Sequence, residues 1–306
     1  MPDEPRIAVL IPCHNEQATV GKVVRDFRRQ LPSATIYVFD NCCTDDTATI
    51  AAAEGAVVVK EPRKGKGFVV EGMFDSVDAD FYVMVDGDDT YPAQDVGRLL
   101  DPVVKGEADM AVAARLADHG EGSFRPLHVA GNNVVRWLIN RIFASNLTDI
   151  MSGYRAFGRK VVRRVPIVSP GFEVETEMTV QMLYNRLKII EVRVPYRPRP
   201  EGSQSKLNTF RDGFRVLWKI FSLFRALKPL TFFGGIGLLL FVLGLAAGIP
   251  PIVGFIQTHK VERFPLAILA TGLMLLSALS VFLGILLHAI NWRFKELHNV
   301  MVRGNK

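Results

Sequence analysis

Two long uncharged segments near the C-terminus most restrict how this chain of 306 residues can fold. Pro229–Thr258 comprises 30 residues without Asp, Glu, Lys or Arg, and Phe264–Trp292 comprises 29 more. About 20 apolar residues span the hydrocarbon core of a bilayer, so each segment is long enough to cross it at a tilt. A buried helical hairpin is the alternative, but soluble helices seldom stay uncharged over such lengths. We therefore predict membrane-spanning helices at about residues 230–256 and 264–290.

Basic residues are concentrated next to these segments. Residues 1–205 contain 25 basic and 28 acidic residues, whereas residues 206–228 contain six basic residues and one acidic residue. Residues 293–306 contain four basic residues and one acidic residue. Because Lys- and Arg-rich flanks stay in the cytoplasm, we predict an integral protein of the inner cell membrane with both termini cytoplasmic. The net charge of +6 thus indicates an anionic lipid bilayer as partner, and no nucleic acid.

The three cysteines, Cys13, Cys42 and Cys43, are too few for a disulfide-stabilised secreted fold. The first 30 residues do not resemble a signal peptide, because charged residues come early and the first apolar segment is short. We therefore expect these cysteines in a reducing compartment, as ordinary side chains that neither bind metal nor form a bridge.

The first 115 residues alternate short apolar segments with helical patterns, and residues 116–206 are less regular. The apolar segments predict strands at Ile7–Ile11, Thr35–Phe39, Val57–Val59, Phe81–Val85, Met110–Ala113 and Ile189–Val194. Helices are predicted at Ala18–Gln30, from Thr44 or Asp45 to Glu54, at Lys66–Ser76, around Asn132–Phe143 and around Glu175–Leu187. This alternation predicts an α/β fold with a mostly parallel sheet covered by helices on both faces.

Polar clusters follow three of the predicted strands. They are His14-Asn15-Glu16, Asp40-Asn41 and Asp86-Gly87-Asp88-Asp89. Ligands of parallel sheets bind beyond the carboxyl ends of the strands, so these clusters are candidate site residues. Asp86 and Asp88 lie one residue apart after an apolar strand, and such oxygen ligands suit Mg²⁺ or Mn²⁺ shared with substrate phosphates. An ordinary acidic turn is the alternative. No glycine fingerprint for dinucleotides and no P-loop occurs in the sequence.

The segment that leads to the uncharged segments has two parts. Pro195–Lys206 is rich in Pro and Arg and cannot form a helix. Residues 208–228 predict an amphipathic helix with Phe or Leu at every third or fourth position and several basic residues. Such a helix beside a membrane span lies in the interface plane, and a packed linker helix is the alternative. We predict domains at 1–207, 208–228, 229–292 and 293–306, the last a basic cytoplasmic tail.

Six motifs occur in one order between about residues 11 and 207. They are Ile11-Pro12-Cys13-His14-Asn15-Glu16, the Asp40–Thr47 segment, Lys64-Gly65-Lys66-Gly67, Asp86-Gly87-Asp88, the Leu147–Phe157 segment with Asp149, Ser152 and Arg155, and Gly202–Leu207. Together they resemble a family 2 glycosyltransferase of the GT-A fold, in the branch of polyprenyl-phosphate sugar transferases similar to dolichyl-phosphate mannose synthase. The chain departs from this family at Thr90, where relatives often carry Gln, and within the altered segment Asn41-Cys42-Cys43.

The resemblance implies roles for particular residues. The residues implied in binding a nucleotide sugar are Pro12, Asn15, Glu16, Asp40, Asn41, Lys66 and Asp86. Asp86 and Asp88 are implied to hold Mg²⁺ or Mn²⁺. The residues implied in catalysis are Asp88, Asp149, Arg115 and Arg125. A lipid phosphate needs a cationic site at the membrane surface, which Arg197, Arg199, Ser203, Ser205 and Lys206 are placed to supply.

The predicted function is an inverting transfer of a hexose from a UDP- or GDP-linked donor to a polyprenyl monophosphate, either undecaprenyl or dolichyl phosphate. A phosphate is already anionic near neutral pH, so this acceptor needs no general base. Two alternatives remain: a membrane transferase that uses a glycan or diacylglycerol acceptor, and an inactive scaffold that binds nucleotide. The resemblance also implies a homo-oligomer.

The segment Asn133-Val134-Val135-Arg136-Trp137 is similar to the QxxRW signature of processive polysaccharide synthases. It has Asn in place of Gln and precedes Asp149, and those synthases need more membrane spans to form a channel. We therefore expect Trp137 in the hydrophobic core rather than in an active site.

Overall fold

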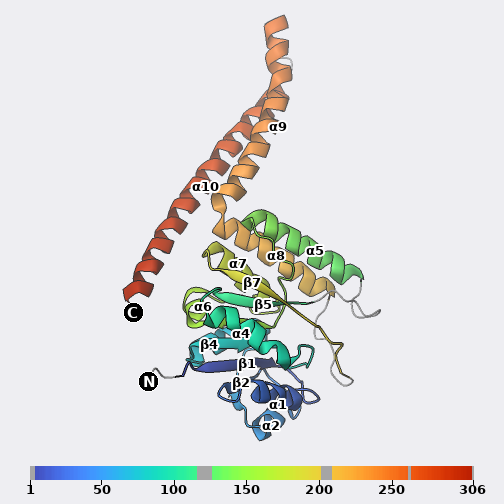
Figure 1. Ribbon diagram of the computed structural model, residues 1–306. Coiled ribbons are helices and arrows are strands. Elements are labelled where there is room, and N and C mark those ends of the chain that lie inside the picture. Colours follow the sequence, from blue (N-terminus) through green and yellow to red (C-terminus); the bar gives the residue numbers. More distant parts are fainter. Residues whose placement is uncertain (1–3, 116–125, 201–208, 261–262, 305–306) are drawn as a thin grey trace. The chain divides into compact units, whose positions relative to one another are not determined.

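The computed structural model describes residues 4–115, 126–200, 209–260 and 263–304 (Figure 1). It divides into two compact units, Met1–Ile220 and Phe221–Lys306. The first unit contains the sheet and the predicted site, and the second contains the long apolar helices.

The first unit is built on a seven-stranded sheet with strand order β3-β2-β1-β4-β6-β5-β7. The strands are β1 (Ile7–Cys13), β2 (Thr35–Asp40), β3 (Val57–Lys60), β4 (Phe81–Met84), β5 (Met110–Arg115), β6 (Arg155–Gly158) and β7 (Ile189–Val194). Only β6 is antiparallel to its neighbours, β4 and β5. The predicted α/β fold with a mostly parallel sheet is confirmed, and the predicted strands lie within a few residues of the observed ones.

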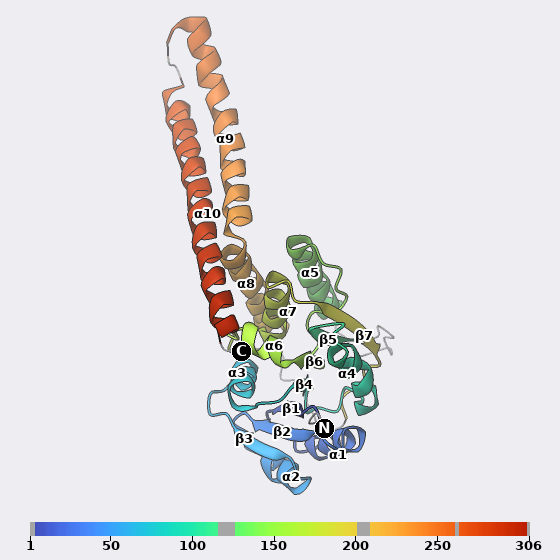
Figure 2. The same ribbon diagram turned by 60° about the vertical axis from the view of Figure 1, so that its left-hand side comes forward.

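Helices cover both faces of this sheet. On one face are α1 (Val20–Gln30), α2 (Thr47–Ala53) and α4 (Val96–Val104), which follows the short 3-10 helix η1 (Ala93–Asp95); on the other are α3 (Lys66–Ser76), α6 (Arg159–Arg164) and α7 (Val174–Tyr184). Helix α5 (Pro126–Phe143) contacts α7, and α8 (Thr209–Leu227) begins in the first unit and ends in the second. Alternate residues of β1 point to opposite faces, as the period of two requires. Val9 and Ile11 pack with Phe27 of α1, whereas Leu10 packs with Met73 of α3 and Met178 of α7. The sheet therefore separates two hydrophobic cores (Figure 2).

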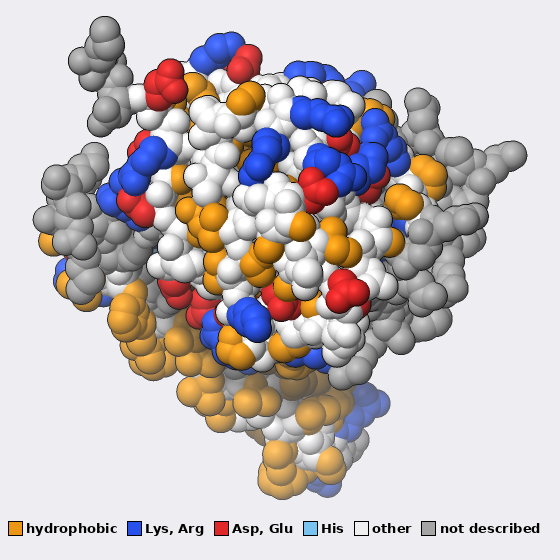
Figure 3. Space-filling view, turned by 90° about the horizontal axis from the view of Figure 1, so that it is seen from below, with side chains coloured by type: hydrophobic (Ala, Val, Ile, Leu, Met, Phe, Trp, Pro, Cys, Tyr) orange, Lys and Arg blue, Asp and Glu red, His pale blue; other side chains and the backbone are white. Residues whose placement is uncertain are grey.

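Charges are mixed on the surface of the first unit. The face in Figure 3 shows Lys and Arg side chains interspersed with Asp and Glu. The ion pairs include Lys22 with Asp26 at 2.8 Å and Arg98 with Asp95 at 2.7 Å. This mixture agrees with the near balance of acidic and basic residues in the first 205 positions.

Helix α8 buries one apolar side and exposes another. Val216 and Ile220 are buried, while Phe214, Leu217 and Trp218 are exposed. The rings of Phe214 and Trp218 stack with their centroids 6.5 Å apart. The exposed stripe therefore contains positions that the sequence pattern assigns to the apolar side of an interfacial helix.

Helix α5 corrects one prediction. Trp137 is 64% exposed and therefore lies outside the core, where we expected it. The helix instead buries Val135 and Ile139, which are four residues apart and share one side. Trp137 lies midway between these two positions in the sequence, and two residues of a helix correspond to a rotation of about 200° away from either.

This correction predicts a contrast between two substitutions. Ile139→Ala removes a fully buried side chain and is expected to lower the free energy of unfolding by about 2–5 kcal/mol. Trp137→Ala is expected to change it by no more than about 0.5 kcal/mol, because the side chain is mostly in solvent. Thermal unfolding of both variants in detergent measures the two changes. An equal loss of unfolding free energy in both would contradict the exposed position of Trp137.

The second unit is a pair of helices, α9 (Pro229–Thr258) and α10 (Phe264–Gly304), which lie alongside each other (Figures 1 and 2). Both are long and apolar enough to cross a membrane, and only 17% and 11% of their most apolar windows are buried within the structure. The alternative of a buried soluble hairpin does not fit this exposure.

Small residues bring α9 and α10 together. Ser277 and Ser280 of α10 donate hydrogen bonds of 2.8 Å to the carbonyl oxygens of Gly237 and Phe233 of α9. A methyl group on Gly237 would overlap the side chain of Val281. The two helices are therefore antiparallel and in close backbone contact along this stretch.

Candidate active site at the ends of the parallel strands

The predicted polar clusters meet at one edge of the sheet. The chain leaves β1 toward β2 on one side, while β4 pairs with β1 on the other side, which makes the β1–β4 boundary a topological switch point. Glu16 and Asp86 follow the carboxyl ends of β1 and β4, and Asp40 is the last residue of β2. This edge is the candidate active site.

Asp86 contacts a largely buried lysine. Its Oδ1 atom lies 2.5 Å from Nζ of Lys66, which also lies 2.5 Å from Oε1 of Glu175 on α7. Burial acts to lower the pKa of Lys66, but the two carboxylates outweigh it and raise the pKa above its usual value. Lys66 therefore carries a positive charge at neutral pH. Gly153 leaves room for Asp86, since a methyl group there would overlap its carboxylate.

Asp88 is buried between a threonine and an arginine. The hydroxyl of Thr90 donates a 2.6 Å hydrogen bond to Oδ1, and Nη2 of Arg199 lies 2.7 Å from Oδ2. Burial raises the pKa of Asp88, and the negative charge of Asp86 raises it further. Thr90, at the position where the family resemblance leads us to expect Gln, supports Asp88 through its hydroxyl.

The donor set at this edge fits a hard divalent cation. Asp86 and Asp88 offer carboxylate oxygens, which Mg²⁺ and Mn²⁺ prefer. Within the part of the chain that the structure describes, no group of three or more His, Cys, Asp or Glu side chains is arranged to hold a metal. A cation at Asp86 and Asp88 would therefore take its other ligands from substrate phosphates and water.

Residues after β1 and β2 form the neighbouring part of the site. Asn15 and Thr44 are joined by a 2.8 Å hydrogen bond from the Thr44 backbone N–H to Asn15 Oδ1. Asp40 accepts a 2.8 Å hydrogen bond from the Cys43 N–H through Oδ1. Pro12 lies near the end of β1, and Glu16 is buried where α1 begins. The structure thus collects these predicted residues on the same side of β1.

Asn41 is engaged with the backbone of the following turn. Its Nδ2 donates to the carbonyl oxygens of Glu61 and Arg63 at 3.2 and 2.8 Å, and its Oδ1 accepts from the Gly65 N–H at 2.8 Å. The side chain therefore fixes the turn that presents Lys66. The sequence identifies Asn41 as a site residue but does not reveal this positioning contact.

Arg115 and Asp149 form a two-pronged ion pair. Nε and Nη2 of Arg115 lie 2.7 and 2.9 Å from Oδ2 and Oδ1 of Asp149. Burial lowers the pKa of Arg115, but the nearby Tyr91 and Asp149 raise it by more. Tyr196 packs against both Arg115 and Tyr91, at 5.5 and 5.2 Å. Through these ring contacts the Arg115–Asp149 pair is linked to Tyr91, in the segment that follows Asp88.

The predicted phosphate-binding residues are only partly described. Arg125, Ser203, Ser205 and Lys206 lie outside the described residues. Arg197 has an exposed side chain, and its backbone N–H donates to the Thr90 carbonyl oxygen at 2.9 Å. Arg199 reaches Asp88, so the structure joins a predicted acceptor residue to a predicted metal ligand.

Two buried charges near the site were not predicted as functional residues. Glu175 contacts Lys66. Arg155 is fully buried and donates to the carbonyl oxygens of Ser152, Ile150 and Glu175 at 2.9, 2.7 and 3.0 Å. The sequence signal for Arg155 is its place in the Leu147–Phe157 motif, whereas nothing in the local sequence distinguishes Glu175 from the neighbouring Glu173 and Glu177.

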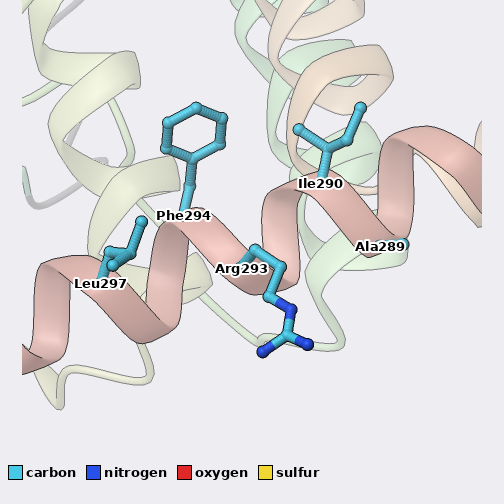
Figure 4. A pocket seen from close by; sticks show the side chains of 5 residues that line it. All are labelled: Ala289, Ile290, Arg293, Phe294 and Leu297. Carbon is cyan, nitrogen blue, oxygen red and sulfur yellow. The ribbon is translucent and has the colours of Figure 1, made fainter.

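Two hollows among the described residues lie apart from these polar clusters. One of ≈ 370 Å³ follows a single side of α10 and is lined by Ala289, Ile290, Arg293, Phe294 and Leu297 (Figure 4). Its lining is almost entirely apolar and contains no carboxylate. Arg293 is the one charged residue in this lining, so the hollow lacks the carboxylates of the candidate active site.

Comparisons with known proteins agree with this geometry. Residues 8–165 match the model of the family described as glycosyl transferase family 2. The chain is 35% identical over 238 residues to glycosyltransferase AglJ of Haloferax volcanii, covering 78% of each. It is 28% identical over 210 residues to the dolichyl-phosphate hexose transferase of the same organism, covering 69% of this chain and 90% of that protein.

Solved structures show the fold. Glucosyl-3-phosphoglycerate synthase from Mycobacterium tuberculosis, in complex with Mn²⁺, UDP-glucose and phosphoglyceric acid, superposes with a TM-score of 0.58 at 23% identity. The match covers 71% of this chain and 79% of that one. The first unit therefore has the architecture of a GT-A domain.

Proposed function

The chain belongs to glycosyltransferase family 2, and we propose that it transfers a hexose from a nucleotide diphosphate sugar to a polyprenyl monophosphate at the cytoplasmic face of a membrane. The observation that carries the proposal is the 2.7 Å contact between Arg199 and Asp88. It joins a carboxylate suited to the donor with an arginine suited to a phosphate acceptor. The same chain continues into two helices long enough to cross a membrane.

The donor half of the site comprises the residues after β1, β2 and β4. Glu16 and Asp40 supply carboxylates that accept hydrogen bonds from the base or ribose hydroxyls. Lys66 supplies a fixed positive charge for the diphosphate. The solved relative that holds UDP-glucose supports a nucleotide sugar as donor. The choice between a UDP- and a GDP-linked sugar is left to the assay below.

Asp86 and Asp88 would hold the metal ion. The Mn²⁺ complex of the solved relative supports a divalent cation, and the two carboxylates fit Mg²⁺ or Mn²⁺. When bound, such a cation offsets the negative charge of the nucleoside diphosphate that departs. Lys66 supplies further positive charge on the Asp86 side, and Arg199 supplies it on the Asp88 side.

The acceptor half is cationic. An oxygen of the lipid phosphate attacks the anomeric carbon, the bond from that carbon to the diphosphate breaks, and the configuration inverts. No general base is required, because the attacking oxygen is already deprotonated. Arg199 and Arg197 attract the acceptor phosphate, and Asp149 holds the Arg115 guanidinium toward the reacting groups. The relative named dolichyl-phosphate hexose transferase supports a polyprenyl acceptor.

The second unit and α8 would place this site at a lipid surface. The helices α9 and α10 would span the membrane, and the exposed Phe214, Leu217 and Trp218 of α8 would enter the interface. The exposed basic residues of α8, Arg215 and Arg225, would meet anionic head groups. The acceptor phosphate would bind at Arg199.

An assay with purified protein tests the proposal. The full chain in nanodiscs is incubated with polyprenyl phosphate, Mg²⁺ or Mn²⁺, and a panel of UDP- and GDP-linked hexoses. We expect one donor to give an acid-labile lipid-phosphate sugar, and we expect EDTA to abolish turnover until metal is added back. A product that resists mild acid would indicate a glycan or diacylglycerol acceptor. Absence of product with every donor and acceptor would indicate an inactive scaffold.

A further inference from the structure

Helix α7 contacts the donor site and α8 through two buried glutamates. Oε1 of Glu175 lies 2.5 Å from Nζ of Lys66 in the donor half. Oε1 of Glu177 lies 2.8 Å from Nζ of Lys219 on α8, and the Glu177 side chain is only 1% exposed. Residues two apart on a helix are rotated by about 200°, so the two carboxylates leave α7 on opposite sides. Helix α7 therefore lies between α8 and the Lys66 turn.

The second oxygen of Glu177 holds a loop. Oε2 accepts hydrogen bonds from the backbone N–H groups of Val168 and Ser169, at 3.1 and 2.7 Å. Lys219 thus supplies the counter-charge for a carboxylate whose other oxygen fixes residues 168–169. Without that lysine, a buried anion would keep the two backbone N–H donors but lose its ion-pair partner, which is costly. The carboxylate would be expected to shift, and its hold on the loop would weaken.

This loop in turn packs against the Lys66 turn without spare room. The Gly67 N–H donates to the Pro170 carbonyl oxygen at 3.1 Å. A methyl group on Gly67 would overlap the Ser169 carbonyl oxygen, and one on Gly65 would overlap that of Pro170. Gly65 also has φ +145°, a conformation that favours glycine. A displacement of residues 168–170 must therefore displace the turn that presents Lys66 to Asp86.

We propose that Lys219 and Glu177 are positioning residues that couple α8 to the donor half of the site through the 168–170 loop and the Lys66 turn. Lys219 contacts Glu177, and Glu177 contacts the 168–169 backbone, so they act on Asp86 through the Lys66 turn. The inference rests on the proposed function, in which the Lys66 turn binds the donor and α8 lies at the membrane. Donor binding then depends on α8 being docked on α7.

Two variants that each remove one positive charge from α8 test the coupling. Lys219→Met removes the contact to Glu177, whereas Arg225→Met removes an exposed positive charge from the same helix. Both are made in the full chain in nanodiscs. Affinity for UDP and for GDP with Mg²⁺ is measured by calorimetry, and backbone hydrogen exchange is measured for peptides covering 64–68 and 165–171.

For Lys219→Met we expect about tenfold weaker nucleotide binding and about tenfold faster exchange in both peptides, a coupling of ordinary size between two sites. The KM for the donor should rise by about the same factor while the KM for the acceptor is unchanged. Lys219→Arg should restore these values, and Arg225→Met should resemble the wild type. If Lys219→Met does not fold, the double variant Lys219→Met/Glu177→Gln, which buries no unpaired carboxylate, is measured with the same expectation.

Unchanged exchange and unchanged nucleotide affinity in Lys219→Met would overturn the coupling. Equal losses in Lys219→Met and Arg225→Met would also overturn it, because the effect would then follow the charge of α8 alone. If the wild type binds neither UDP nor GDP, the proposed function fails. Hydrogen exchange then decides the coupling without reference to that function.

Discussion

Replacing Asp88 by Asn is expected to lower kcat/KM for sugar transfer by about 10³-fold, equivalent to about 4 kcal/mol, while the protein remains folded. The substitution keeps the shape of the side chain and removes its negative charge. A bound divalent cation contributes several kcal/mol of charge stabilisation, and a neutral amide is a poor ligand for it. The amide also loses the ion pair with Arg199, which at present measures 2.7 Å.

Asp89→Asn is the matched control for this substitution. Asp89 is the next residue, but its carboxylate pairs with Lys22 at 2.8 Å on the surface. Its φ of +56° suits Asn as well as Asp, so the backbone is not strained by the change. We expect activity within about threefold of the wild type, and Mn²⁺ affinity measured by electron paramagnetic resonance should fall only in Asp88→Asn. Near-normal activity and Mn²⁺ affinity in Asp88→Asn would remove Asp88 from the metal site.

Replacing Arg155 by Met is expected to lower the free energy of unfolding by roughly 4 kcal/mol and the unfolding midpoint by about 10 °C. The guanidinium is fully buried and donates to three carbonyl oxygens and to the hydroxyl of Thr179. Burial lowers the pKa of Arg155, yet arginine stays charged at neutral pH. Methionine fills the volume but leaves these buried acceptors without their donor.

The test is a thermal unfolding series in detergent with Arg163→Met as the comparison. Arg163 has an exposed side chain on α6, and its loss is expected to change the free energy of unfolding by less than about 0.5 kcal/mol. Arg155→Lys should fall between the two, because an ammonium group cannot reach the same set of acceptors. A midpoint for Arg155→Met within 2 °C of that for Arg163→Met would show that the buried network adds little stability.

The strands next to the site can be predicted from the sequence because they are buried on both faces and are therefore apolar. β1, β2 and β4 are short apolar segments that end in polar residues, and parallel strands align those ends at one edge. The order of the motifs therefore locates the candidate site before any coordinates are known. The metal-suited pair Asp86 and Asp88 follows from the same pattern.

The antiparallel strand β6 cannot be predicted from such a pattern. It has four residues and begins with the fully buried Arg155, so no apolar alternation marks it. Helix α7 is predicted from the sequence, but the burial of its Glu175 and Glu177 is not. A sequence pattern treats charges as exposed, and these charges are buried because partners from distant segments neutralise them.

The pairing of site residues also lies beyond the sequence. Motifs identify Asp88 and Arg199 separately, and the fold brings them together across more than 100 residues of chain. Asp149 and Arg115 are likewise both implied by the family resemblance, whereas their pairing emerges only from the geometry. Tertiary structure decides which charges meet, because ion pairing between distant segments leaves no local periodicity.

The close contact between α9 and α10 has a consequence for how this protein assembles. Lipid chains are as apolar as leucine, so water exclusion does not hold two helices together inside a bilayer. Close backbone approach at Gly237 and the serine-to-carbonyl bonds of Ser277 and Ser280 do not depend on water. The hairpin is thus suited to form as a stable pair within lipid, independently of the folding of the sheet domain.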